Sequence, residues 1–324
     1  MSAPTHPSSP SADGSPAASL VAGRAITANP EIKRPARSFL SSSLRRFVAD
    51  KLSMACLILF AIIMLVTITA PLIATYILGT SPDEFLRTPE GRIATLQPPG
   101  PGYPLGTDEL GRDNLTRLLY AGRVSLTIGF LVTLVSLAIG APLGLIAGYY
   151  GGRVDDAVNA AVQFTNNIPS LFILIILSVM FTPSVLGLAI IFGLFYWPGT
   201  TRQVRGLVLS IRSRDYVDAA RVLGASDARI LARHVLPNVT SIVTVVAGFD
   251  VASAILGESA LSFLGFGVPV PLSSWGNMLS GSQDTFRSAP WLVYPPGLMI
   301  LLTVLCVFLI ADGLRDAFDP RLRS

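Results

Sequence analysis

The sequence predicts an all-α integral membrane protein with six transmembrane helices. Of its residues 51% are apolar and only 14% are charged, whereas a soluble domain carries about a quarter charged residues. The mean hydropathy is +0.59. The apolar residues also come in long runs, and a bilayer-spanning helix needs roughly 20 mostly apolar residues. This pattern excludes an ordinary soluble fold.

We expect six membrane spans near residues 52–78, 124–149, 157–181, 185–197, 239–264 and 291–314. The fourth run is the shortest, and it is also compatible with a re-entrant segment or with the second half of one long helix.

Three domains are expected along the chain. Residues 1–38 are rich in Ser, Pro and Ala and lack apolar periodicity, which predicts a disordered cytoplasmic leader. Residues 39–123 would hold the first transmembrane helix and a long external loop. Residues 124–324 would form a core domain with the other five transmembrane helices.

Loop charge predicts the orientation, because cytoplasmic loops are enriched in Lys and Arg. With six spans and a cytoplasmic N-terminus, the inner segments 24–51, 153, 202–233 and 315–323 hold 18 of the 24 Lys and Arg residues. Fusing the third and fourth runs would leave only 9 inside. We therefore expect six spans, both termini in the cytoplasm and a cytoplasmic loop at residues 198–238.

This loop has the pattern of two short amphipathic helices. The apolar stripe of the first helix recurs at i, i+3, i+4 and i+7: Tyr216, Ala219, Ala220 and Leu223. Gly224 follows where a helix C-terminus needs a left-handed residue. Ser226 offers an N-cap for a second helix, which ends near Leu236 and Pro237. Such a pair either lies on lipid headgroups or docks into a groove of a partner protein.

The loop resembles the EAA loop of binding-protein-dependent ABC importer permeases. It contains Asp218-Ala219-Ala220, then Gly224 and, nine residues later, His234-Val235-Leu236-Pro237. Asp218 stands where the family usually has Glu, and His234 where it usually has Ile. The resemblance implies that this loop carries a coupling helix that seats in a separate ATPase subunit.

Two further segments resemble the C-type subunit of the dipeptide, oligopeptide and nickel permease family. They are PLGTDELGRD at residues 104–113 and LGESALSFLG at residues 256–265. The resemblance implies a type I ABC importer permease fold in a bacterial plasma (inner) membrane. It also implies four kinds of partner: a homologous second permease subunit, two ABC ATPase subunits, an external substrate-binding protein and a peptide substrate. Dipeptides, longer peptides, glutathione-like compounds and nickel chelates all stay open as cargo.

Catalysis is not expected in this chain. A phosphate loop needs Gly-Lys-Ser/Thr, but the two lysines, Lys33 and Lys51, follow Ile32 and Asp50. Two histidines cannot complete a zinc or Ser-His-Asp site. We expect no cofactor here, with ATP and Mg²⁺ in the partner ATPase subunits, and the modest net charge of +4 gives no reason to expect nucleic acid. The alternatives of another class are an ATP-independent secondary transporter and a membrane scaffold.

Polar side chains recur at helical spacing in the third predicted span: Asn159, Gln163, Asn166 and Asn167. They would either line the translocation path or hydrogen-bond between helices. Asp250 and Glu258 lie in the fifth span, where charges are costly. We expect either that one of them transiently meets the ammonium group of a passing peptide or that they pair with an Arg of the partner subunit.

Small residues recur every four positions in the second span: Ser136, Gly140, Gly144 and Gly148. This stripe predicts a close helix contact. In the external loop, Asp108, Glu109 and Asp113 lack the ligand spacing of a calcium loop. There we expect Thr107 to cap a short helix with acids in its first turn.

Overall fold

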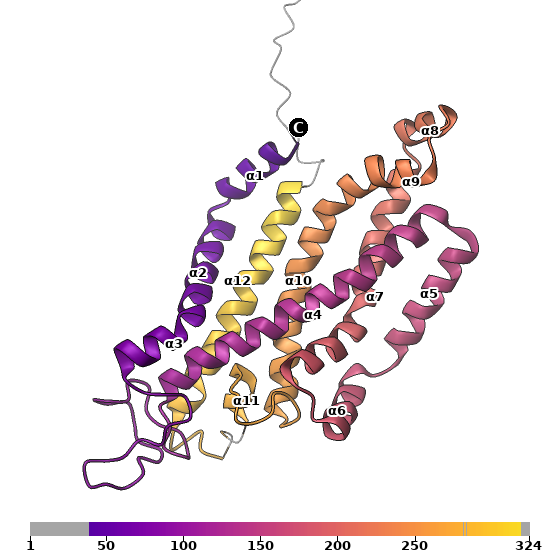
Figure 1. The fold of residues 1–324 in the computed structure, drawn as a ribbon. Helices are drawn as coiled ribbons and strands as arrows, with labels where there is room; N and C mark the ends of the chain where they lie inside the picture. The colour runs from indigo at the N-terminus through magenta and orange to yellow at the C-terminus, as the bar shows by residue number, and fades with distance from the viewer. Residues whose placement is uncertain (1–38, 281, 283, 319–324) are drawn as a thin grey trace, which may run out of the picture. The chain divides into compact units, whose positions relative to one another are not determined.

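The computed structural model describes residues 39–280, 282 and 284–318 (Figure 1). The predicted leader, residues 1–38, lies outside the described residues. In the described part the regular structure is helical, and residues 79–113 add only isolated β-bridges. The elements, with η for π- or 3₁₀-helical turns, are α1 Phe39–Ala49, α2 Lys51–Ile68, α3 Ala70–Ile73, η1 Ala74–Leu78, α4 Asn114–Tyr150, α5 Gly152–Asn167, α6 Ser170–Phe181, α7 Val185–Arg212, α8 Asp215–Val222, α9 Asp227–Ile230, η2 Leu231–Val235, α10 Leu236–Phe263, α11 Trp275–Leu279, η3 Pro290–Leu292 and α12 Tyr294–Phe318.

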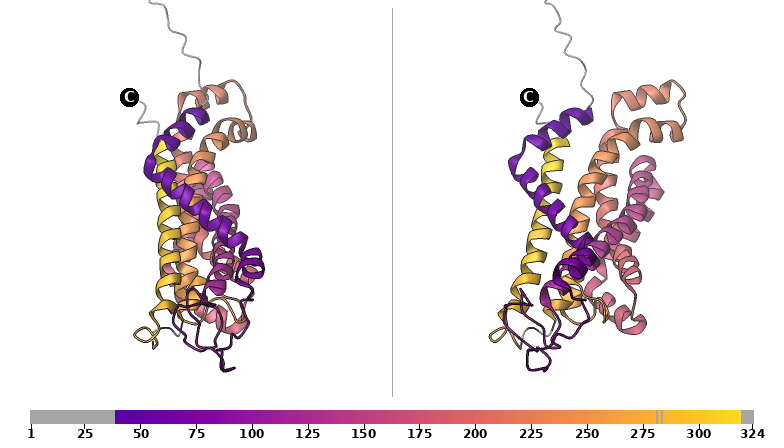
Figure 2. Two further views of the ribbon diagram at one scale, coloured as in Figure 1. Left: turned by 90° about the vertical axis from the view of Figure 1, so that its left-hand side faces the viewer. Right: turned by 60° about the vertical axis from the view of Figure 1, so that its left-hand side comes forward.

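The long helices run in alternating directions between two ends (Figures 1 and 2). The order is α2, α4, the α5–α6 pair, α7, α10 and α12. One end carries α1, α8 and α9, together with the C-terminal end of α12. The opposite end carries α11, the end of α6 and residues 79–113. We call these the α8 end and the α11 end.

The close contact of α4 with α7 confirms the predicted small-residue stripe. A Cβ added at Gly144 would lie 2.7 Å from the carbonyl oxygen of Thr201 and 2.9 Å from Cβ of Val204. Gly140 and Gly148 are equally tight against α7. The glycines therefore let the two backbones approach, as in other helix pairs that pack through small residues.

Helix α7 is longer than predicted. The sequence predicted a short span ending at Trp197 and a loop from Pro198, but the helix continues through Pro198 to Arg212. Proline removes one backbone hydrogen bond and usually kinks a helix. Here Pro198 is buried, and Thr201, Val204 and Val208 beyond it pack on α4, which keeps the segment helical.

The third predicted span is broken. Residues 157–181 were expected to form one helix, but α5 and α6 meet at 73°. Ile168 and Pro169 lie at the break with extended backbone. Since the residue before a proline avoids helical backbone angles, Pro169 ends α5.

Four helical segments of the described chain are long and apolar enough to cross a membrane: Lys51–Ile68, Asn114–Tyr150, Asp227–Phe263 and Pro290–Phe318. The bent pair α5–α6 makes a fifth if its two helices form one broken span and not a re-entrant loop. Helix α7 is not among them, because polar and charged residues follow its short apolar first half.

At the α11 end, the prediction that Thr107 caps a helix is wrong. Its hydroxyl is buried inside the loop, where it donates to the carbonyl of Ala94 and accepts from the backbone N–H of Gln97 at 2.9 Å. Asp113 is the real N-cap of α4 and accepts from the N–H of Thr116 at 2.7 Å. Both residues are polar N-cap types, so the sequence alone did not distinguish them.

The glycine contact leads to a stability prediction. Gly144→Val should destabilise the protein by about 3 kcal/mol, the upper end of the usual overpacking effect, because its side chain would collide with the backbone of α7. Gly206→Val is the matched control, since a Cβ at Gly206 on α7 meets nothing within 4 Å. Thermal melting in detergent measures both, and equal melting temperatures would contradict the proposed contact.

Candidate functional site

The helix pair α8–α9 projects from the α8 end, beyond the last turn of α7 (Figure 2). Gly224 has φ +80° and follows the C-cap of α8. The N–H of Gly224 donates to the carbonyl of Arg221, and the N–H of Ala225 donates to that of Ala220, both at 3.0 Å. This is a Schellman turn, so the prediction of a left-handed glycine here is confirmed.

The pair is held by an apolar centre that the sequence pattern missed. Val217, Ile230 and Val235 are fully buried against residues at the end of α7, including Ile211. Of the predicted apolar stripe, Tyr216, Ala219 and Leu223 are exposed, and only Ala220 contacts this centre. Val217 stands at i−3 from Ala220, a spacing that a search for the inward face could have used.

The outward side of α8 is apolar at its tip. Val222 is 87% exposed and Leu223 is 86% exposed. Asp218 and Arg221 form an exposed ion pair of 2.8 Å beside them. Leu236 and Pro237, at the start of α10, are exposed as well. Two exposed aliphatic side chains with a polar border are the arrangement of a small docking surface.

One polar contact ties this projection to α4, and two more join α7, on which it packs, to α4 and α5. The Tyr149 hydroxyl at the end of α4 donates to Asp227 Oδ1 at 2.7 Å. Arg212 Nη1 donates to the carbonyl of Tyr149 at 3.1 Å. Arg205 forms a two-pronged ion pair with Asp155 of α5, with its Nη2 2.6 Å from Oδ2. A displacement of α8–α9 would therefore act on α4, α7 and α5 together.

Asp250 lies where α10 meets the α4–α7 pair. Its Oδ2 accepts from Ser136 at 2.9 Å and from Thr200 at 2.8 Å. No basic side chain forms an ion pair with it within the described residues. The side chain is half-buried, so it has a place at the helix junction and still reaches the surface of this chain.

Glu258 has a different setting, because it is only 1% exposed. Its carboxylate accepts from Ser262 at 2.6 Å and from Ser125 of α4 at 3.2 Å. The same Ser125 hydroxyl accepts from the backbone N–H of Trp275, the first residue of α11. Glu258 thus joins α10, α4 and α11 and does not line a path in this conformation.

The polar residues of α5 are mostly uncovered. Gln163, Asn166 and Asn167 are exposed, whereas Asn159 donates to Asp155 at 2.9 Å. Only Val162 of this helix is buried. The sequence correctly placed these polar side chains along one helix, and no described part of the chain covers Gln163, Asn166 or Asn167. No cluster of three or more His, Cys, Asp or Glu suited to a metal lies in the described part.

Residues 140–324 match the family described as "binding-protein-dependent transport system inner membrane component", and residues 38–99 match "N-terminal TM domain of oligopeptide transport permease C". The chain is 36% identical to the oligopeptide transport system permease protein OppC of Haemophilus influenzae, over 90% of this chain and 92% of that protein. It is also 36% identical to the dipeptide transport system permease protein DppC of Alkalihalophilus pseudofirmus, over 91% and 94%.

A solved structure of the MetNI methionine ABC transporter in an inward-facing conformation has a chain with a similar fold. The TM-score is 0.52 at 17% identity, over 63% of this chain and 97% of the other. At this identity the likeness concerns the fold alone.

The Glu258 network leads to a prediction about stability. Glu258→Ala should lower the free energy of unfolding by about 2–3 kcal/mol or more, because it leaves buried hydroxyls without an acceptor and opens a cavity. Glu258→Gln, which keeps one amide oxygen as an acceptor, should melt closer to the wild type. Thermal melting of the purified protein separates the two, and wild-type melting temperatures for both variants would show that the carboxylate does not hold α11.

Proposed function

Because the chain belongs to the family of binding-protein-dependent transport system inner membrane components, we propose that it forms half of the membrane pore of an ATP-driven peptide importer. ATP is hydrolysed in separate subunits, and this chain receives their movement. One structural observation supports this best: the exposed tip of Val222 and Leu223 is held rigidly by a Schellman turn at the α8 end. An amphipathic helix whose apolar side lacks cover is suited to a groove on a partner protein.

The topology that we propose has six spans and both termini in the cytoplasm. Six alternating passes, α2, α4, α5–α6, α7, α10 and α12, support it, as does the excess of Lys and Arg in the segments at the α8 end. Helix α7 would be the fourth pass along the chain and would complete the six. Its apolar first half packs along α4, and its polar second half would extend the pair into the cytoplasm. The α8 end is then cytoplasmic and the α11 end external.

Partners would complete the transporter. A homologous second permease subunit would pack beside this chain, two ABC ATPase subunits would hold ATP and Mg²⁺, and an external binding protein would deliver the substrate. The exposed Gln163, Asn166 and Asn167 of α5 are suited to a water-filled path shared with the second subunit. The half-buried Asp250 would face the same path.

The names of the relatives support peptides as the cargo. Relatives named for oligopeptides and for dipeptides are equally similar to this chain, at 36% identity. This favours peptides over the nickel chelates and glutathione-like compounds that the sequence left open, and it does not separate short peptides from longer ones.

Docking by α8 can be tested at its tip. The double variant Val222→Asp, Leu223→Asp should weaken binding of the ATPase subunits roughly tenfold or more, because it places charge in the centre of an apolar contact. Folding should be unaffected, since both side chains are exposed. Co-purification of the ATPase subunits and ATP-driven uptake in proteoliposomes measure the effect. Leu110→Asp, an exposed position at the α11 end, is the control. Normal uptake in the double variant would rule out this docking mode.

The topology can be tested by labelling single cysteines. Cys56 and Cys306 are buried and can be replaced by Ser. A membrane-impermeant maleimide should label Thr95→Cys, in the proposed external loop, in intact spheroplasts. It should label Ala228→Cys, on α9, only after permeabilisation, because charged reagents do not cross the bilayer. Labelling of both positions from outside would contradict six spans with this orientation.

A further inference from the structure

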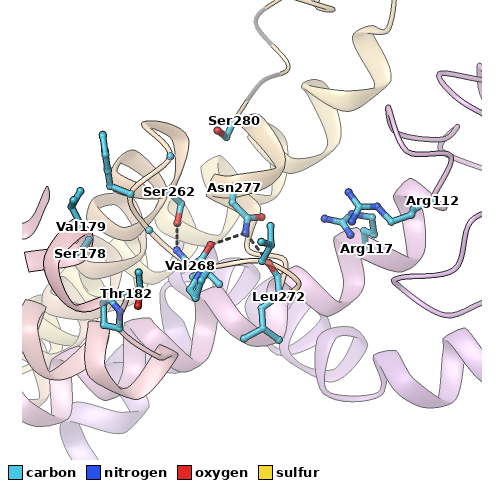
Figure 3. Close-up of a pocket in the computed structure, with 16 residues that line it drawn as sticks. Arg112, Arg117, Ser178, Val179, Thr182, Ser262, Val268, Leu272, Asn277 and Ser280 are labelled. Carbon is cyan, nitrogen blue, oxygen red and sulfur yellow. Dashed lines mark hydrogen bonds between the residues drawn. The ribbon is translucent and has the colours of Figure 1, made fainter.

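A cavity of about 500 Å³ opens at the α11 end (Figure 3). Its wall is built from the start of α4 and the residues before it, the end of α6, the segment after α10, and α11. None of these parts belongs to the α8 docking surface. The cavity therefore needs its own explanation.

One side of the cavity is basic. Arg112 and Arg117 line it with side chains only 18% and 10% exposed. Both approach the same Asp108 Oδ2, Arg112 Nε at 2.7 Å and Arg117 Nε at 3.5 Å. The Nη1 group of Arg117 also donates to the carbonyl of Pro82 at 3.3 Å and lies 3.8 Å from the more exposed Asp83.

The basic side keeps unused donors. One carboxylate, that of Asp108, serves two guanidinium groups, and Asp83 adds only a long contact. The Nη groups of Arg112 have no hydrogen-bond partner in the described part of the chain. A guanidinium presents two parallel N–H groups that match the two oxygens of a carboxylate. The arrangement therefore suits one further carboxylate.

Across the cavity lies a buried hydroxyl without a partner. Figure 3 places Ser178, Val179 and Thr182 on the side opposite Arg112 and Arg117. Ser178 is 7% exposed, and its Oγ makes no hydrogen bond to any described residue. Buried polar groups are nearly always hydrogen-bonded, so a turn of this side chain toward a ligand in the cavity would give its hydroxyl the partner it lacks.

Between the two polar sides the wall is apolar and held in place. Val268 and Leu272 lie there, and Asn277 Nδ2 donates to the carbonyls of both, at 3.3 and 2.9 Å (Figure 3). The N–H of Val268 donates to Ser262 Oγ at 3.1 Å, and Ser262 in turn donates to Glu258. The cavity thus has an apolar centre between a basic side and a hydroxyl.

We propose that this cavity receives the C-terminal end of a short peptide before it enters the pore. The peptide's carboxylate binds Arg112 and Arg117, its last side chain packs on Val268 and Leu272, and Ser178 bonds a backbone amide of the peptide. The depth of the two guanidinium groups favours the end of a chain over a folded protein surface. This inference rests on the proposed function, because it takes the cargo to be a peptide and the α11 end to be external.

The test compares the tripeptide Ala-Ala-Leu as a free acid and as its C-terminal amide. The permease–ATPase complex is placed in nanodiscs without the external binding protein, and binding is measured by saturation-transfer NMR. The wild type should bind the acid about tenfold more tightly than the amide, the usual effect of a charge-assisted hydrogen bond. Arg112→Gln should remove this preference, and Arg112→Lys should restore part of it.

Two further variants distinguish the loss of a contact in the cavity from a general effect of mutation on folding or charge. Ser178→Ala should weaken the acid and the amide by the same factor, and it keeps the test decisive if Arg112→Gln does not assemble. Arg92→Gln, an arginine 80% exposed in the same external segment, should change nothing. A lack of binding by the acid, or equal binding of acid and amide to the wild type, would overturn the inference.

Other outcomes distinguish the source of the carboxylate and the function itself. If Arg112→Gln weakens docking of the external binding protein and leaves the acid-to-amide ratio unchanged, the cavity takes an acidic side chain of that protein and the proposal is wrong. If the wild-type complex imports peptides in proteoliposomes but binds the acid and the amide equally in nanodiscs, only the cavity assignment fails. If it imports no peptide with ATP, the proposed function fails.

Discussion

Gly140, Gly144 and Gly148 bring α7 against α4 at a distance that no larger side chain would permit, and much of the structure follows from that contact. With 37 residues, α4 is about 55 Å long, and α7, with 28, about 42 Å, whereas the hydrocarbon core of a bilayer is about 30 Å thick. Both helices are thus longer than a direct crossing of that core requires. Because α7 leads directly into α8, the α4–α7 contact also sets the position of the helix pair α8–α9.

The two carboxylates of α10 are bound differently where this helix meets the α4–α7 pair. Asp250 takes two hydroxyls, one from each member of the α4–α7 pair, and those hydroxyls are also 2.9 Å from each other. They remain partnered if α10 shifts. Glu258 is buried, and its serine ligands join α10 to α4 and α11. A shift of α10 would therefore leave the two hydroxyls at Asp250 bonded to each other, whereas at Glu258 it would break a buried contact to α4.

The sequence predicted those features that depend on local pattern and missed those that depend on contacts between helices. The left-handed Gly224 and the glycine stripe of α4 follow from steric rules that act on single residues, and both are confirmed. Pro198 was taken as a helix end because nothing local shows that α4 covers the residues after it. Val217 was missed because its burial depends on Ile230 and Val235, which reach it only after the chain turns. The choice between Thr107 and Asp113 as N-cap depended likewise on the packing of a whole loop.

The uncovered side of α5 gives a physical argument about what this chain needs around it. Helix α5 exposes Gln163, Asn166 and Asn167, whereas α6, which follows it in the bent pair, is strongly apolar. If the bent pair is one membrane span, these amides lie at or near the bilayer. Amide side chains that face lipid would have no hydrogen-bond partners, which is costly. They must instead meet water or another protein. The described residues of this chain do not cover them. In the proposed importer, a pore shared by two permease chains would supply both water and a protein neighbour.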